Sequence, residues 1–214
     1  MTKNLKISLI MILATAAALL DVANVAGHDT PTAATGDERS DRLVRPDSQR
    51  LSEASDGKVT FVEFPDFECE ACGAAYPAIE ELRDQYGDQI TFVVRYFPLH
   101  GNSEAAARAA EAAAEQGKFE EMYDLLFQNQ AEWSHSESPK EEVFFGYAEQ
   151  MDLDMEEFRS VYDAPATLEK IQQDKEDGQA VGVTGTPTFF LNGDKVEVSS
   201  FAELLAQIDD ALAS

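Results

Sequence analysis

The chain contains two cysteines, Cys69 and Cys72, within the stretch FVEFPDFECEACGAAYPAIEEL. Two thiols at this Cys-x-x-Cys spacing can form a structural disulfide, supply half of a metal site, or act as a reacting pair. A structural disulfide would close a very small loop and would remove little entropy from the unfolded chain. A metal site usually needs four ligands, and the three histidines, His28, His100 and His135, have no ligand spacing. Redox chemistry is therefore favoured over both alternatives, which stay open here.

The residues around the pair predict the local structure that thiol chemistry needs. Residues 58–64 (KVTFVEF) form a β-branched and aromatic run of strand length, and helical spacing of apolar residues continues from Cys72 to about Gly87. Cys69 would then lie at a helix N-terminus, where backbone N–H groups and the helix dipole favour a thiolate. Cys72, one turn further along, would be more buried and could attack a mixed disulfide formed on Cys69.

Two further residues are candidates for the same site. Glu63 lies in the middle of an apolar strand, so we expect a partly buried carboxylate with a raised pKa that can exchange a proton with Cys72. The alternative for Glu63 is an exposed acid on an edge strand. Pro187 directly precedes another strand in GVTGTPTFFLNG, and bonds before proline are the ones that can be cis. The alternative for Pro187 is an ordinary proline at a strand start.

The rest of the chain predicts the elements that hold these residues. A second buried strand is expected over residues 89–97, and a hairpin turn at Asn192-Gly193. Helix starts are expected at Ser103, Ser138, Asp154 and Ser200. Strands separated by helices imply parallel pairing, whereas the hairpin implies an antiparallel edge. The predicted fold class is therefore α/β, a mixed central sheet flanked by helices, with a helical insertion.

The first 27 residues are typical of a signal peptide or an N-terminal membrane anchor. Lys3 and Lys6 precede an apolar run from Ile7 to Leu20. Residues 28–42 are polar and aperiodic, which predicts a flexible linker before a folded part that begins near residue 43. Export would place the cysteine pair in a compartment where disulfides persist. We therefore expect a periplasmic or other extracytoplasmic protein, released or tethered to the membrane.

Composition limits the class of partner. The 214 residues carry a formal net charge of −25, which argues against nucleic acid because phosphate binding needs a basic face. A solvated acidic surface is the simplest interpretation. No motif implies a metal, a flavin or a nucleotide, and the sequence has no phosphate-cradling glycine-rich loop, so no cofactor is expected.

From about residue 43 to residue 214 the sequence resembles the DsbA-like branch of the thioredoxin-fold superfamily. The resemblance is carried by VEFPDFECEAC, VVRYFPLHGNSEAAARAAEAA, QGKFEEMYDLLFQNQ and GVTGTPTFFLNG. It implies a thioredoxin sheet with a helical insertion at about residues 103–177. It also implies that Cys69 is the nucleophile, Cys72 the resolving thiol and Glu63 the buried acid beneath them. Pro187 would be the cis-proline that faces the pair, and the backbone of Thr186 would bind a substrate peptide.

The expected function is an exported thiol–disulfide oxidoreductase that forms disulfides in client proteins and is regenerated by a membrane redox partner. Two alternatives are an exported disulfide reductase of the same fold and a non-enzymatic thioredoxin-like peptide-binding domain. Glu70 lies between the cysteines and Glu68 lies next to them. Because like charges disfavour a thiolate on Cys69, we expect a weaker oxidant than the strongest relatives.

Overall fold

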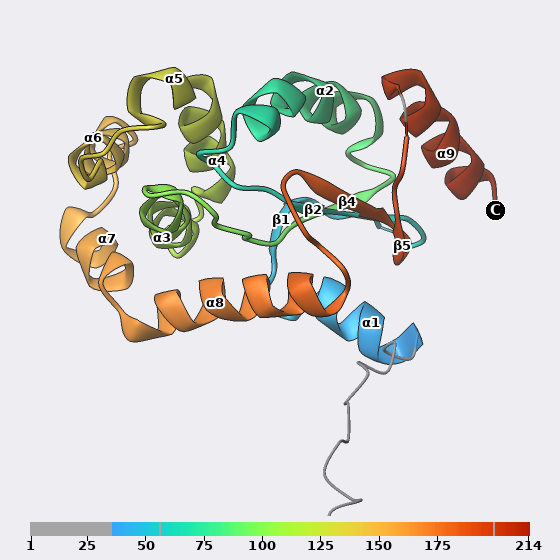
Figure 1. Ribbon diagram of the computed structural model, residues 1–214, viewed down its shortest axis with the longest axis horizontal. Coiled ribbons are helices and arrows are strands. Elements are labelled where there is room, and N and C mark those ends of the chain that lie inside the picture. Colours follow the sequence, from blue (N-terminus) through green and yellow to red (C-terminus); the bar gives the residue numbers. More distant parts are fainter. Residues whose placement is uncertain (1–35, 56, 199) are drawn as a thin grey trace, which may run out of the picture. The chain divides into compact units, whose positions relative to one another are not determined.

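A computed structural model, which describes residues 36–55, 57–198 and 200–214, places a five-stranded mixed sheet at the centre of the fold (Figure 1). The strand order is β1-β3-β2-β4-β5. β2 and β3 are parallel, and the other neighbours are antiparallel. The strands are β1 (Gln49–Ser52), β2 (Thr60–Phe64), β3 (Thr91–Val94), β4 (Thr188–Leu191) and β5 (Asp194–Lys195).

Helices cover both faces of the sheet (Figure 1). On one face lie α2 (Glu70–Tyr86) and α9 (Phe201–Ala213), and on the other α1 (Gly36–Leu43) and α8 (Pro165–Ala180). The helices between β3 and α8 pack together beside the sheet; they are α3 (Ser103–Ala114), α4 (Phe119–Gln128), α5 (Gln130–Trp133), α6 (Glu141–Gln150) and α7 (Met155–Tyr162). The predicted α/β fold with an inserted helical region is confirmed.

The β2 strand is buried on both faces, as its sequence indicates. Phe61 packs into the core cluster that includes α2 and the inserted helices. Val62 and Phe64 pack into the second cluster, with Leu43 of α1. Alternation therefore sends successive side chains into two separate cores. Each such buried side chain stabilises the fold by about 1.5–3 kcal/mol, which leaves the end of β2 a rigid support for the cysteines.

Two of the predicted helix starts are capped by the predicted side chain, and a third, at Ser103, is not. The Asp154 carboxylate accepts hydrogen bonds from the N–H groups of Glu156 and Glu157, so the predicted cap is confirmed. Ser200 likewise caps α9. Ser103 instead is the first residue of α3, and its hydroxyl accepts the N–H of His100 at 3.1 Å.

The predicted start at Ser138 is three residues early, because α6 begins at Glu141. Pro139 follows Ser138 in the sequence. A residue before proline is disfavoured in helical geometry, which keeps Ser138 itself out of the helix.

The predicted linker over residues 28–42 is wrong at its end, because residues 36–43 form α1. This segment is almost wholly polar, but Leu43 is buried and the Arg39 guanidinium lies over the Phe190 ring at 5.6 Å. Contacts with distant residues, and not periodicity, stabilise this helix. The predicted signal or anchor over residues 1–27, and residues 28–35, lie outside the described residues. In the described part of the chain, no helix is long and apolar enough to cross a membrane.

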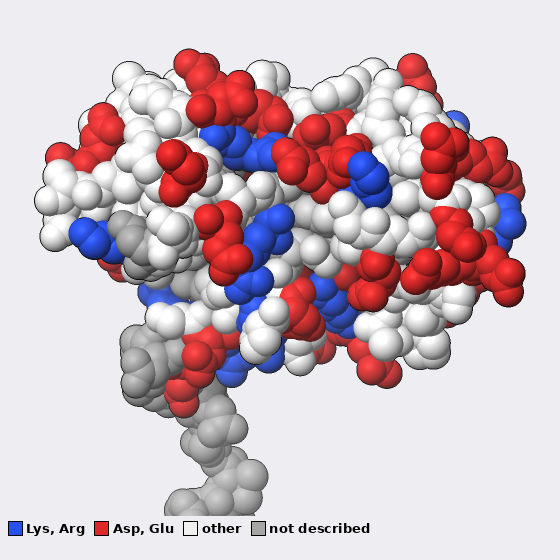
Figure 2. Space-filling model, turned by 180° about the vertical axis from the view of Figure 1, so that it is seen from behind, with Lys and Arg blue, Asp and Glu red and all other residues white. Residues whose placement is uncertain are grey.

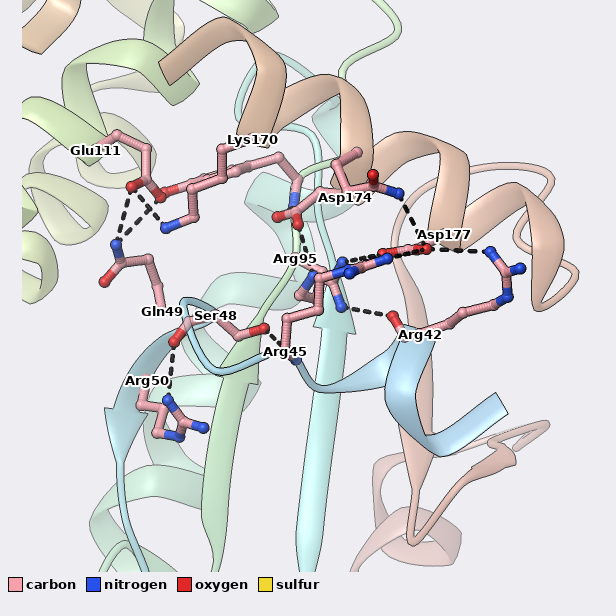
Figure 3. A network of polar contacts seen from close by, with 12 residues as sticks. Arg42, Arg45, Ser48, Gln49, Arg50, Arg95, Glu111, Lys170, Asp174 and Asp177 are labelled. Carbon is pink, nitrogen blue, oxygen red and sulfur yellow. Dashed lines mark hydrogen bonds and ion pairs between the residues drawn. The ribbon is translucent and has the colours of Figure 1, made fainter. Parts of the chain in front are cut away.

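An ion-pair network attaches α8 and α1 to the end of β3 (Figure 3). Arg95 is fully buried, and its guanidinium donates to Asp174 and to Asp177, each at 2.8 Å. A third bond reaches the carbonyl oxygen of Arg42 at 2.5 Å, and the Arg45 side chain also pairs with Asp177. Because the loop that carries Thr186 and Pro187 follows α8, the network also fixes the start of that loop.

The same network separates the pKa values of its two carboxylates. Burial raises the pKa of Asp174 to about 6, although Arg95 opposes the shift. Burial would also raise the pKa of Asp177, but hydrogen bonds from Arg45 and Arg95 outweigh it and hold that pKa below its ordinary value. Both carboxylates therefore depend on the buried guanidinium of Arg95.

Acidic side chains are spread over the visible face in Figure 2, with Lys and Arg among them. On this face the acidic side chains are not gathered in one patch. Such a surface is solvated and keeps the protein soluble.

Candidate active site

Cys69 lies where the chain leaves β2 and begins α2. It is the N-cap residue of α2, with extended backbone angles, and its carbonyl oxygen accepts the N–H of Gly73 at 3.1 Å. The N–H of Cys69 donates to the carbonyl of Asp66 at 3.0 Å, which closes a turn over the connecting loop. Cys69 is partly exposed, Cys72 is 1% exposed, and both are free thiols. One thiol is therefore accessible at a helix N-terminus, and the other lies beneath it.

The Thr186–Pro187 peptide bond lies against the accessible thiol. This bond is cis, as the family resemblance implied. The Cys69 Sγ atom donates to the carbonyl oxygen of Thr186 at 3.4 Å. The fold thus brings together two segments that are 117 residues apart in the chain. A backbone carbonyl beside a reactive sulfur is suited to hold an extended peptide at the reacting atom.

The buried thiol of Cys72 is held by the loop before the helix. The backbone N–H of Asp66 donates to the Cys72 Sγ atom at 3.4 Å. Burial raises the pKa of the Cys72 thiol well above its ordinary value, although this hydrogen bond opposes the shift. Cys72 therefore needs a base before it can react as a thiolate.

Glu63 is a buried carboxylate on the central strand β2. It is 3% exposed, and the alternative of an edge-strand acid is wrong because β2 lies between β3 and β4. The Tyr123 hydroxyl, which comes from the inserted helix α4, donates to Glu63 Oε2 at 2.9 Å. Burial raises the pKa of Glu63 to about 7, and the Tyr123 hydrogen bond limits the rise. Near neutral pH this group can therefore both accept and return a proton.

Asp66 is a residue of the site that the sequence analysis missed. Its buried carboxylate accepts the N–H groups of Glu68 and Leu99, at 2.9 and 2.8 Å. The His100 Nδ1 atom lies 2.6 Å from the same carboxylate. Asp66 thus joins the cysteine loop to the loop that follows β3. A signal for it was present, since an acidic residue directly after a buried strand and a proline needs partners.

The two glutamates near Cys69 differ in their surroundings. Glu68 is 1% exposed, and its carboxylate accepts the N–H groups of Asn102 at 2.6 Å and His135 at 2.9 Å. Glu70 is exposed, and its carboxylate lies 3.3 Å from His135 Nε2. Glu68 is thus directed toward the inserted helices by hydrogen bonds, and the expected effect of both carboxylates on a Cys69 thiolate stays a prediction.

Trp133, of the inserted helix α5, has a structural role. Trp133 is fully buried, its indole N–H donates to the Leu126 carbonyl, and its ring packs edge-on against Phe144. Among the described residues, no group of three or more His, Cys, Asp or Glu side chains could hold a metal ion.

The comparisons with known proteins agree with this geometry. A family model described as Thioredoxin matches residues 51–210, which is most of the chain. The chain belongs to the DsbA-like thioredoxin family.

Two solved structures show how far the similarity to the DsbA-like family extends. A thioredoxin-like oxidoreductase from Silicibacter pomeroyi DSS-3 is 30% identical, with 81% of this chain and 98% of that chain covered and a TM-score of 0.68. The thiol-disulfide exchange protein alpha-DsbA2 from Wolbachia pipientis is 22% identical over 82% and 94% of the two chains, with a TM-score of 0.68. At that identity the second likeness shows the fold alone.

Some relatives are much longer than this DsbA-like chain. The Na(+)/H(+) antiporter NhaA of Herminiimonas arsenicoxydans is 35% identical over 168 residues, which is 78% of this chain and 26% of the antiporter. The chain thus spans about a quarter of the length of this curated relative.

Glu63→Gln is expected to stabilise the protein at high pH. Because the pKa of Glu63 rises from 4.5 to about 7 on folding, the protonated form stabilises the fold. This contribution is fully present below about pH 4.5 and is lost as pH rises through about 7. Glutamine stays neutral and can still accept the Tyr123 hydrogen bond. The free energy of unfolding, measured by denaturant titration, should rise by roughly 3 kcal/mol at pH 8 and stay unchanged at pH 4.

The same variant is expected to lose activity while it gains stability. Without a base for Cys72, resolution of a mixed disulfide at pH 7.5 should slow by about 100-fold. The rate can be followed by release of a fluorescent client from Cys69, with alkylation of Cys69 by iodoacetamide as the control that should not change. An unchanged release rate would remove Glu63 from the proton transfer.

Proposed function

We propose that this protein is an exported thiol–disulfide oxidoreductase that forms disulfides in client proteins. A client thiolate attacks Cys69 Sγ in the Cys69–Cys72 disulfide. The Cys72 sulfur leaves as a thiolate and takes a proton, and a mixed disulfide remains on Cys69. A second client thiolate then attacks the client sulfur of that bond, and Cys69 leaves. Two electrons pass from the client to the pair, which ends as two thiols.

Each site residue has a distinct part in this proposal. Cys69 is the exchanging sulfur, and Cys72 is the leaving group or, in the reverse direction, the resolving thiol. Glu63 supplies the proton to the buried Cys72 thiolate, for which its pKa of about 7 is suited. Thr186, before the cis Pro187, offers its carbonyl to the client backbone beside Cys69. The same groups in reverse order describe a reductase, so direction depends on the reduction potential.

One observation supports this function above the others: a partly exposed N-cap thiol lies against the Thr186 carbonyl and above a buried second thiol. A peptide-binding domain without redox activity would have no use for the buried thiol or for a neighbouring carboxylate with a raised pKa. The single exposed large hydrophobic side chain of the described residues, Leu99, follows the same loop and donates its N–H to Asp66. It offers a client an apolar contact near the pair.

The test is the redox equilibrium of Cys69 and Cys72 in glutathione buffers of graded potential, read by thiol trapping and mass. A potential near about −120 mV supports a disulfide donor, and one near about −270 mV supports a reductase. Because Glu70 is exposed at the helix N-terminus, we expect a value between these limits. Absence of reversible exchange would contradict the enzyme and leave the peptide-binding alternative.

Turnover in the oxidising direction needs an oxidant, which we propose to be the disulfide of a membrane redox partner. The proposed location is outside the cytoplasm, with residues 1–27 as a signal or anchor. A related protein from Salmonella enterica, 22% identical, is described as a periplasmic thioredoxin-like protein. Fractionation of cells that produce the full chain tests the location, and recovery in the cytoplasm would contradict it.

A second candidate role follows from the antiporter relatives. Because a stretch similar to this chain forms part of an Na(+)/H(+) antiporter in Herminiimonas arsenicoxydans, we propose as this second role that the protein acts on the extracytoplasmic thiols of a membrane transporter. Trapping with a Cys72→Ser variant would recover such a client as a mixed disulfide. Recovery of soluble clients alone would contradict this role.

A further inference from the structure

Among the contacts between the inserted helices and the redox site, the side chain of Gln130 reaches the backbone of the cysteine loop itself. This residue begins α5, and its Nε2 atom donates to two backbone carbonyls. The carbonyl of Phe67 accepts at 2.8 Å and that of Cys69 at 2.9 Å. These carbonyls lie on either side of Glu68 in the loop that delivers the reactive sulfur. The Gln130 amide therefore bridges the two ends of the turn over residues 67–69.

Gly73 provides the space that this arrangement needs. A Cβ atom at Gly73, in the first turn of α2, would overlap Gln130 Oε1 and would lie 2.9 Å from the carboxamide carbon of Gln130. The side chain of Gln130 thus packs directly on the helix backbone, where any larger residue would displace it. The amide orientation follows from chemistry, because only its nitrogen can donate to the two carbonyls.

The far end of this contact is rigid. The carbonyl of Gln130 accepts the N–H of Ser134 at 2.9 Å, and Trp133 of the same short helix is fully buried in the inserted core. The neighbouring Asn129 side chain donates to the Leu125 carbonyl at 2.9 Å. Gln130 is therefore anchored in the insertion at its backbone and attached to the cysteine loop at its amide.

We propose that Gln130 is a positioning residue for disulfide exchange, and that Gly73 is small so that Gln130 can reach the cysteine loop. By holding the carbonyls of Phe67 and Cys69, the amide keeps the Cys69 sulfur directed at the Thr186 carbonyl, where a client sulfur must approach in line. Without it the loop samples other orientations, and the fraction of productive encounters falls. This inference rests on the proposed function. It adds that a residue of the inserted helices sets the rate of disulfide exchange at Cys69.

The test uses Gln130→Met, which keeps the length of the side chain and removes its donor. The second-order reaction of reduced protein with a small aromatic disulfide is followed by absorbance of the released thiol. We expect the rate to fall about tenfold, with a shift in the reduction potential of the pair. Gln128→Met is the matched control, since the Gln128 amide donates to the Tyr76 hydroxyl and not to the cysteine loop. That control should stay within about twofold of the natural protein.

Gly73→Ala tests the same contact from its other side. The added methyl group should displace the flexible amide and so reproduce the Gln130→Met rate without any change at Gln130. In the double variant the two effects should not add, because both remove one contact. Ala also favours helix over Gly, so a loss of folding is not expected to obscure the result.

Gln130→Glu provides a readout that a merely structural role would not change. An ionised carboxylate facing two carbonyls repels them, whereas a protonated one can donate one hydrogen bond. The rate relative to the natural protein should therefore be lowest at pH 8 and recover as pH falls below about 5.

Three results would overturn the inference: an unchanged rate and potential in Gln130→Met, additive effects in the double variant, or a pH-independent rate ratio in Gln130→Glu. Failure of the natural protein itself to exchange disulfides would instead contradict the proposed function. The two failures are thus distinguishable in one series of measurements.

Discussion

Replacement of Cys69 by Ser is expected to abolish disulfide exchange and leave the fold intact. A serine hydroxyl can still donate to the Thr186 carbonyl, so the free energy of unfolding should change by less than about 1 kcal/mol. The remaining thiol, Cys72, is 1% exposed and has a raised pKa, so it cannot replace the lost nucleophile. The rate with a small aromatic disulfide should fall at least about 100-fold.

The opposite substitution should behave differently. Cys72→Ser keeps the accessible nucleophile but removes the resolving thiol, so a mixed disulfide with a client should accumulate on Cys69. Mass measurement after reaction with a disulfide-bonded peptide detects one added peptide half per chain. If Cys72→Ser gave no adduct while Cys69→Ser did, the order of the two cysteines would be reversed.

The second large effect is on stability and concerns Arg95. Replacing it by Met leaves Asp174 and Asp177 buried without their shared guanidinium and exposes the Arg42 carbonyl to an apolar neighbour. Breaking a buried ion pair by removal of one partner costs about 3–5 kcal/mol. Denaturant unfolding at pH 7 should show this loss.

The loss should depend on pH in a defined direction. Without Arg95 the pKa values of Asp174 and Asp177 rise, so the variant loses stability as pH rises and recovers part of it near pH 5. Arg50→Met is the matched control, because Arg50 lies in the same region and its side chain donates to the Ser48 carbonyl at 3.0 Å (Figure 3). A change at Arg95 as small as that at Arg50 would show that the network contributes little.

Features that depend on short stretches of chain could be predicted from the sequence. The hairpin at Asn192 and Gly193 is one example, since both residues adopt positive φ, at 49° and 92°. The N-terminal position of Cys69 on α2 is another, because a strand, a turn and a helix start follow from fewer than twenty residues. The burial of Glu63 could be predicted, because an acid inside an apolar strand implies it. Its hydrogen-bond partner could not, because Tyr123 lies 60 residues away in the chain.

The sequence by itself therefore determined the position of the cysteine pair between a strand and a helix, and the α/β class with an inserted helical region. Those features depend on side-chain period, capping and backbone preference, which act between residues near one another in the chain. The tertiary structure places Thr186 against Cys69, as the family resemblance implied, and it alone decided that Glu68 faces the insertion and that Gln130 contacts the cysteine loop. These contacts join segments 34 to 117 residues apart. They depend on how whole elements pack, because a buried polar group bonds to whichever partner the packing brings within reach.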